Sequence, residues 1–252
     1  MNLPDVPRVI YNKTSLREVI CQFRFPTILR IRVNDPVDFQ EEIRTKFPLF
    51  KLRQDPVAIG IPEQIRQVIA PQIPKMYDFS DENETSQVSL TEDFLALSTK
   101  HYERFENFMD SVDLALNALS KVYQPSFYVR VGFRYIDIIN REILEIQSVE
   151  WADLLNGCFA GELGAKLSGE ITETTTNTIY NFDWGALRCK HGLRNFDNEG
   201  SCYYIDNDFF KEGKIQFQEI QGLLKRFNEY ERNFLRYCIS DKLHSAMEPM
   251  EP

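Results

Sequence analysis

Strict alternation of apolar and polar residues marks several segments of the chain, and such alternation is typical of strands with one buried face. In SFYVRVGFRYIDII, residues 126–139, the apolar face carries Phe127, Val129, Val131, Phe133 and Tyr135. The opposite face carries Tyr128, Arg130, Gly132, Arg134 and Ile136. REVICQFRF, residues 17–25, repeats this design with Gln22 and Arg24 on its polar face. LRIRV, residues 29–33, alternates in the same way, with Arg30 and Arg32 on the polar side.

Helical spacing of apolar residues predicts three further segments. NDPVDFQEEIRTKF, residues 34–47, is predicted to be a helix capped by Asn34 or Asp35 and stopped by Pro48. Residues 104–123 are predicted to form a long helix, and residues 216–247 a second long helical region. Between the first two, residues 51–74 contain four prolines and are interpreted as an irregular connection that includes at most one short element.

Short alternating runs separated by turn residues predict the remaining strands. KMYDF, SQVSL and DFLALST, between residues 75 and 99, are predicted to form an antiparallel meander. Three more strands are expected within EITETTTNTIYNF, ALRCKHGL and SCYYIDNDF, between residues 170 and 209. Antiparallel strands segregated from helices predict an α+β fold, with the helices on one face of the sheet.

The order of the elements predicts one compact domain over residues 1–252. Residues 1–140 and 141–252 each show the order strand, helix, meander, helix, which suggests an internal pseudo-repeat. In this interpretation REILEI, residues 141–146, matches REVICQF, and EWADLLNG matches the first helix.

Composition indicates a folded cytoplasmic protein. Of the 252 residues 43% are hydrophobic, the apolar runs are short, and the N-terminal stretch does not have the pattern of a secretory signal. The five cysteines are odd in number and lack a C-x-x-C pair, so we expect reduced thiols rather than disulfides or a zinc knuckle.

The net charge of -9 disfavours nucleic acid as a general partner, but the charge is unevenly distributed. Residues 1–75 hold twelve Lys and Arg against eight Asp and Glu, a balance of +4, so the remainder carries -13. The basic surplus of the N-terminal part could serve an anionic ligand or dock against the acidic remainder of the same chain.

Two constellations suggest catalytic chemistry. Cys189 and His191 are two residues apart on a predicted strand, although a catalytic thiol and imidazole must also point at each other. Asp206 and Asp208 would share one face of a strand and could hold magnesium together with Glu170 or Glu173. The plainer interpretation of the aspartates is that they end a strand and turn the chain. Phosphate-binding glycine loops are absent from the sequence, and no cofactor is indicated.

The motifs REVICQFRF, SLTEDFLALSTKHYERFENF, VRVGFRYIDII and YYIDNDFF, with FLRYCISDKLHSAMEP near the end, occur in this order along nearly the whole chain. Together they resemble a sporadically distributed bacterial family of uncharacterised proteins. The resemblance implies a single-domain cytosolic protein and supplies no catalytic residue, and the patchy distribution of such families suggests a link to defence. The chain departs from the family pattern at TSLREVI, which lacks the usual proline, and at Ser240, where threonine is usual.

The arginines of the predicted sheet give the leading functional hypothesis. Charge-assisted binding of an anionic ligand or a protein partner would use Arg24, Arg30, Arg32, Tyr128, Arg130 and Arg134. The bland interpretation is a half-exposed face whose arginines pair with acidic residues of the same chain. We therefore predict a binding or regulatory protein without its own catalytic site, and the alternative is a metal-dependent enzyme acting on nucleotides or phosphodiesters through Asp206 and Asp208. Pairing with a second copy is a third interpretation.

Overall fold

The chain folds into two compact units that are interleaved along the sequence. The computed structural model describes residue 3, residues 5–54 and residues 75–251. Unit 1 comprises Met1–Val19, Gly132–Lys211 and Glu219–Pro252, and unit 2 comprises Ile20–Val131 and Glu212–Gln218. Antiparallel strands with helices packed against them build the fold, so the predicted α+β class is confirmed.

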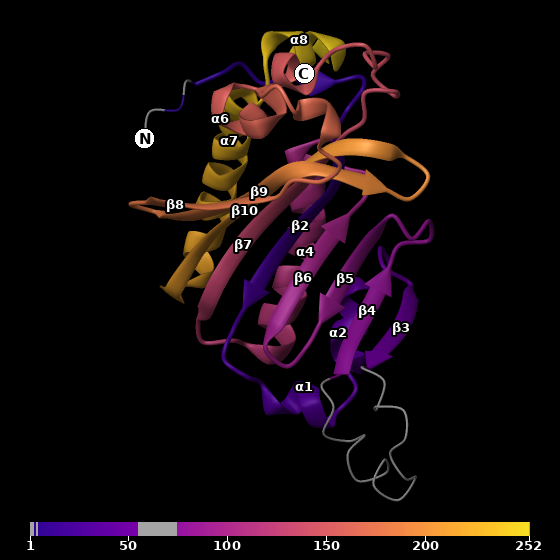
Figure 1. The fold of residues 1–252 in the computed structure, drawn as a ribbon. Helices are drawn as coiled ribbons and strands as arrows, with labels where there is room; N and C mark the ends of the chain where they lie inside the picture. Colours follow the sequence, from indigo (N-terminus) through magenta and orange to yellow (C-terminus); the bar gives the residue numbers. More distant parts are fainter. Residues whose placement is uncertain (1–2, 4, 55–74, 252) are drawn as a thin grey trace, which may run out of the picture. The chain divides into compact units, whose positions relative to one another are not determined.

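Unit 2 is built on an antiparallel meander covered by a long helix (Figure 1). Its strands are β3 (Leu49–Gln54), β4 (Lys75–Ser80), β5 (Ser86–Leu90) and β6 (Phe94–Thr99), followed in the sheet by β2 (Leu16–Arg24), of which the part from Ile20 belongs to unit 2. The helix α4 (Phe105–Tyr123) buries Phe108, Val112, Leu116 and Leu119, which recur at helical spacing. The three predicted meander strands and the long helix are therefore confirmed.

Two predictions in the N-terminal part of unit 2 need correction. LRIRV forms the short helix α1 (Leu29–Val33), not an extended segment, and buries only Ile31. Five alternating residues cannot separate the two periods, because Leu29 and Val33 also share a face of a helix. The following helix, α2 (Val37–Ile43), begins after Pro36, and Asp35 accepts hydrogen bonds from Lys75 and Tyr77 instead of capping it.

The irregular connection predicted for residues 51–74 begins within a strand. β3 occupies Leu49–Gln54 and pairs antiparallel with β4, with Leu49 opposite Ser80 and Gln54 opposite Lys75. This agrees with the expected short strand in the region. The rest of the predicted connection, residues 55–74, lies outside the described residues.

Unit 1 packs one long helix on an antiparallel sheet (Figure 1). The strands run in the order β7 (Tyr128–Ile139), β10 (Gly200–Ile215), β9 (Gly185–Phe196) and β8 (Thr176–Phe182), and parts of β7 and β10 belong to unit 2. The helix α7 (Ile220–Cys238) places Phe227, Tyr230 and Phe234 against aromatic side chains of residues 180–184. Of these rings, Phe227 and Phe234 are fully buried in the core, and the others are half-buried around them.

Short elements close unit 1 at one end. These are β1 (Ile10–Tyr11), α5 (Trp151–Leu154), α6 (Gly157–Ala160), the 3-10 turns η2 (Gly161–Gly164) and η3 (Ser168–Glu170), α8 (Asp241–Ala246) and β11 (Pro249–Met250). A further 3-10 turn, η4 (Phe217–Glu219), comes directly before α7, at the boundary with unit 2. β1 pairs antiparallel with β11, and Ser240 caps α8 by accepting a hydrogen bond from the Leu243 amide.

The REILEI segment does not form the strand that a repeat of REVICQF would require. Residues 141–145 form turns, and of the apolar residues in the segment Leu144 is buried while Ile143 is 60% exposed. Arg141 holds this turn by donating to the Val149 carbonyl and by lying over the Trp151 ring. EWADLLNG contains the expected helix only as the single turn α5. The pseudo-repeat of residues 1–140 and 141–252 stays a prediction.

Among the residues that the structure describes, no helix is both long enough and apolar enough to span a lipid bilayer.

Candidate functional site

In unit 2, the predicted arginines of the N-terminal part are held by their own unit. Arg24 donates to Asp93 at 2.8 Å, and Arg32 forms a fork-like pair with Glu92. Arg30 donates to the Val122 carbonyl and lies over the Tyr123 ring. These contacts attach the β5–β6 turn and the end of α4 to the segment after β2. Arg24 and Arg32 therefore agree with the simpler interpretation, in which arginines of the predicted basic face pair with acidic residues of the same chain.

The two arginines of β7 belong to different units and have different partners. In unit 2, Arg130 donates to Gln22 at 3.3 Å and makes further interactions. In unit 1, Arg134 binds both carboxylate oxygens of Asp206 at 2.6 Å. This two-point geometry is the strongest form of an arginine–carboxylate pair. Asp206 holds the pKa of Arg134 above its usual range by accepting these bonds.

The prediction that Tyr128 lies on the same exposed face as the arginines is wrong. Its side chain is 1% exposed, and its ring packs edge-on against Phe23 and Phe25 in the core of unit 2. Val129 is 39% exposed instead, whereas Val131 and Phe133 are buried as expected. Tyr128 and Val131 are three residues apart yet both buried, so the alternation slips by one residue between them, as it does at a β-bulge. Tyr128 therefore cannot offer its ring to a ligand beside the arginines.

The two aspartates of β10 lie on a strand and face cations. Asp206 stands opposite Lys190 of β9, and Asp208 stands opposite Arg188. Because Arg134 occupies both oxygens of Asp206, that carboxylate has little capacity left for magnesium. Glu170 lies in η3 and Glu173 in the loop before β8, neither on a strand next to β10. Within the described residues, side chains with the grouping of a metal site are not found.

Cys189 and His191 lie on the inner face of β9, as their spacing predicts, but they do not form a nucleophile–base pair. The Cys189 thiol is fully buried, and burial raises its pKa, which keeps it protonated. The His191 ring bonds to the Tyr203 hydroxyl through Nδ1 at 2.6 Å. The imidazole is therefore engaged by tyrosine rather than by thiol.

The outward face of β9 carries three cations that the sequence-based hypothesis missed. Arg188, Lys190 and Arg194, here called the β9 cation row, are all exposed. They alternate with Leu187, Cys189 and Leu193 on the buried face, so β9 is a strand with one apolar and one basic side. This alternation is visible in the sequence ALRCKHGLR.

The β9 cation row differs from the predicted arginines in its partners. Among the described residues, none of its three members forms an ion pair. Arg188 and Arg194 instead lie over the rings of Phe210 and Phe196, at 6.0 and 5.7 Å from the ring centres. Aromatic rings hold a guanidinium in place without neutralising its charge. The row is therefore a set of exposed cations outside the ion pairs of the described residues, with Asp206 and Asp208 of β10 standing opposite Lys190 and Arg188 on the same face.

The strand next to the β9 cation row is an edge without the usual protection. β8 stands last in the strand order, and its sequence TNTIYNF has no charged residue and no proline. On its outward face Ile179 is 50% exposed and stands opposite Arg188, and Asn177 stands opposite Lys190. Natural edges commonly carry lysine, proline or a bulge that prevents pairing with another strand. β8 is thus suited to accept one more strand.

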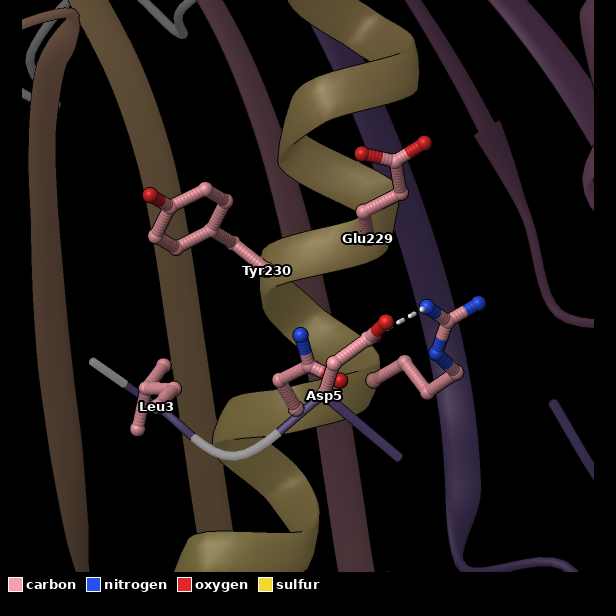
Figure 2. Close-up of a pocket in the computed structure, with 6 residues that line it drawn as sticks. Leu3, Asp5, Glu229 and Tyr230 are labelled. Carbon is pink, nitrogen blue, oxygen red and sulfur yellow. Dashed lines mark hydrogen bonds and ion pairs between the residues drawn. The ribbon is translucent and has the colours of Figure 1, made fainter. Parts of the chain in front are cut away.

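A pocket of about 360 Å³ lies in unit 1, where the N-terminal segment runs beside α7. Figure 2 shows the residues that line it. Asp5 accepts a hydrogen bond from Arg232 at 3.2 Å, and the Val6 amide donates to Asn233 at 3.1 Å. Leu3, Glu229 and Tyr230 complete the described lining. Because Asp5 neutralises Arg232, this pocket is poorly suited to an external anion.

Comparison with known proteins gives no match: no family model matches the chain, and neither does any curated protein.

Proposed function

We propose that the protein is a binding protein that recognises an acidic, extended segment of a partner protein at β8 and β9 of unit 1. The observation that carries this proposal is the β9 cation row, which is exposed and without ion pairs in the described chain. The proposal keeps the predicted class, recognition through a basic sheet face, and moves the site to Arg188, Lys190 and Arg194. Of the arginines first predicted, Arg24, Arg32 and Arg134 are engaged by internal carboxylates.

The geometry of an added strand supports this choice of partner. A strand paired with β8 would lie two strand spacings, about 10 Å, from β9. Its outward acidic side chains could then meet the long side chains of Arg188 and Lys190 across β8, where the short Asn177 and Ile179 leave room. Main-chain hydrogen bonds to the edge would give affinity, and the cations would select acidic sequences. The net charge of -9 disfavours nucleic acid at the same face.

A labelled peptide tests the proposal directly. A fluorescein-labelled peptide of alternating glutamate and valine is expected to bind, and fluorescence anisotropy is expected to show weaker binding as salt rises. Charge reversal at Arg188→Glu with Lys190→Glu is expected to weaken binding at least tenfold, because each lost charge becomes a repulsive one. A peptide of alternating glutamine and valine should bind far less tightly than the acidic peptide.

The matched control is Lys225→Glu with Arg226→Glu. Both residues are exposed on α7, and the substitutions change the net charge by the same amount. Circular dichroism and thermal melting identify variants that fail to fold, and Arg188→Gln with Lys190→Gln serves as a milder pair. Equal losses in the β9 and α7 variants would contradict the proposal, as would tighter binding of an oligonucleotide than of the acidic peptide.

Self-pairing and catalysis are the competing functions. A second copy pairing through β8 would show as a dimer in sedimentation that Ile179→Lys abolishes, because an edge lysine blocks strand pairing. The alternative, a metal-dependent enzyme acting on nucleotides or phosphodiesters, would need Asp206 and Asp208 and would lose activity in chelator. Arg134 makes this alternative the weaker one, since it already binds both oxygens of Asp206.

A further inference from the structure

A second pocket in unit 1 lies on the buried side of β9, away from the cation row. Its volume is about 240 Å³, and its walls are residues 158–163 and 173–176 together with His191 and Tyr203. His191 is 7% exposed, and its ring packs against Phe159 with ring centres 4.6 Å apart. His191 is thus a buried imidazole that also lines a pocket, so the state of its second ring nitrogen, Nε2, determines what the pocket can bind.

The hydrogen bonds of Tyr203 decide which nitrogen of His191 carries the proton. The Tyr203 hydroxyl lies 2.7 Å from the Phe159 carbonyl oxygen, which can only accept. The single hydroxyl proton is therefore given to Phe159. The Tyr203 oxygen then accepts from His191 Nδ1, 2.6 Å away, so Nδ1 is protonated. In the neutral ring the proton is thus on Nδ1, and Nε2 holds a bare lone pair.

The His191 Nε2 atom has no hydrogen-bond partner among the described residues. Burial lowers the pKa of His191, because the surroundings penalise the charged ring. At neutral pH the ring is therefore uncharged and Nε2 is an acceptor. Nε2 is not among the buried polar atoms that lack a partner, so it reaches the solvent of the pocket, where a ligand with an N–H or O–H group could displace water and donate to it.

The charged groups that line this pocket indicate the sign of the charge that a ligand would carry. Glu162 and Glu173 are the charged residues among the twelve that line it, and both are acidic. The other polar groups of residues 174 and 175 already have partners, since Thr174 bonds to the Leu193 amide and Thr175 to Tyr204. The pocket thus combines a neutral imidazole acceptor with two carboxylates, which suits a cation that can donate hydrogen bonds.

We propose that this pocket binds a small organic cation with N–H donors, of the primary ammonium or guanidinium class, that donates to His191 Nε2 and pairs with Glu173. The volume is below the range of about 300–1,000 Å³ typical of drug-sized ligands, so the ligand or ligand group has few non-hydrogen atoms. The site is independent of the proposed acidic-segment surface, because it lies on the other face of β9.

Nuclear magnetic resonance titration with methylguanidinium tests the site, because it reports on both binding and the imidazole. Binding is expected in the millimolar range that fragments of this size reach, with a shift of the His191 Nε2 resonance. Tetramethylammonium has the same charge without N–H groups and is expected to bind about tenfold more weakly, because charge-assisted hydrogen bonds are lost. Acetate should not bind.

Two variants and one control complete the experiment. Glu173→Gln, at an exposed position, is expected to weaken methylguanidinium binding about tenfold and to leave the fold unchanged. Tyr203→Phe removes the tautomer lock, so the nitrogen spectrum should show protonation of Nε2 and binding should fall. Lys190→Ala, on the opposite face of β9, should change neither. Equal binding of the two cations, an unmoved Nε2 resonance, or preferential binding of Zn²⁺ at His191 would overturn the proposal.

Discussion

Replacing Asp137 with asparagine is expected to raise the free energy of unfolding at pH 7.5 by up to about 3 kcal/mol, less the cost of the buried amide N–H groups that asparagine adds. Asp137 is 1% exposed, and burial raises the pKa of its carboxyl from 3.8 to about 6. Each unit of pKa shift corresponds to about 1.36 kcal/mol between the two protonation states, so the charged form costs about 3 kcal/mol in the fold. Asparagine removes that cost because it cannot ionise.

The raised pKa of Asp137 determines how the effect of the substitution on stability changes with pH. A carboxyl whose pKa is raised in the fold binds its proton more tightly folded than unfolded, so the stability it contributes is complete below pH 4. This stability is lost as the pH rises from about 4 to about 6, and the loss is constant above that. The gain from Asp137→Asn should therefore be absent at pH 3.5, grow across this window and level off at neutral pH.

The surroundings of Asp137 make the substitution a mild one sterically. Ser15 donates to Asp137 Oδ1 at 2.7 Å, and asparagine keeps an oxygen there. The other oxygen, Oδ2, is buried and has no hydrogen-bond partner in the described chain. A second buried carboxyl, Glu231, accepts from Asn207 at 3.2 and 3.1 Å, and burial with the nearby Asp137 charge raises its pKa well above the usual value.

Urea unfolding at pH 3.5, 5 and 7.5 measures the effect. Asp197→Asn is the control, because Asp197 is exposed and its loss should change stability little at every pH. A gain for Asp137→Asn that is the same at all three pH values would show that ionisation is not its cause. Adding Glu231→Gln should extend the gain, because burial raises the pKa of this carboxyl as well.

Replacing Gly192 with alanine is expected to destabilise the protein by about 3 kcal/mol, the upper part of the range for overpacked sites. An added Cβ at this position of β9 would lie 1.9 Å from the Thr174 carbonyl oxygen and 2.6 Å from its carbon. Thr174 cannot retreat freely: its amide donates to the Leu193 carbonyl at 2.9 Å, and its hydroxyl accepts from the Leu193 amide at 3.0 Å. The clash must therefore break these bonds or distort β9.

Gly222→Ala provides the opposite result in the same unit. Gly222 lies within α7, and nothing lies within 4 Å of the Cβ that alanine would add. Alanine is favoured over glycine inside a helix by about 1 kcal/mol, so this variant should be more stable than the parent chain. Chemical denaturation of both variants separates them, and a tolerated Gly192→Ala would show that Thr174 is not held against β9 as described.

Regular elements with enough residues could be predicted from the sequence alone. The alternation over residues 128–139 and the helical spacing over residues 105–123 are long enough to select one period. LRIRV is too short for that, and one slipped residue moved Tyr128 to the core. Local pattern assigns faces well until a bulge intervenes, because every residue beyond it changes side.

The candidate sites depended on long-range contacts that a pattern does not contain. Arginine spacing revealed a basic face, but the partners Glu92, Asp93 and Asp206 come from distant segments. Only their positions in the fold distinguish neutralised arginines from the β9 cation row. Likewise, the proton position on His191 depends on the Phe159 carbonyl of α6, which accepts the Tyr203 hydroxyl proton. The sequence around His191 does not reveal this contact.

The difference in exposure among the five cysteines allows unfolding of the chain to be followed by thiol labelling. Cys158 is exposed at the edge of the His191 pocket, whereas Cys21, Cys189, Cys202 and Cys238 are buried. Burial raises the pKa of the four inner thiols, so they hold little reactive thiolate while the chain is folded. A maleimide dye would therefore label one position of the native chain and, in a timed pulse, register each opening of the core as additional labelled cysteines.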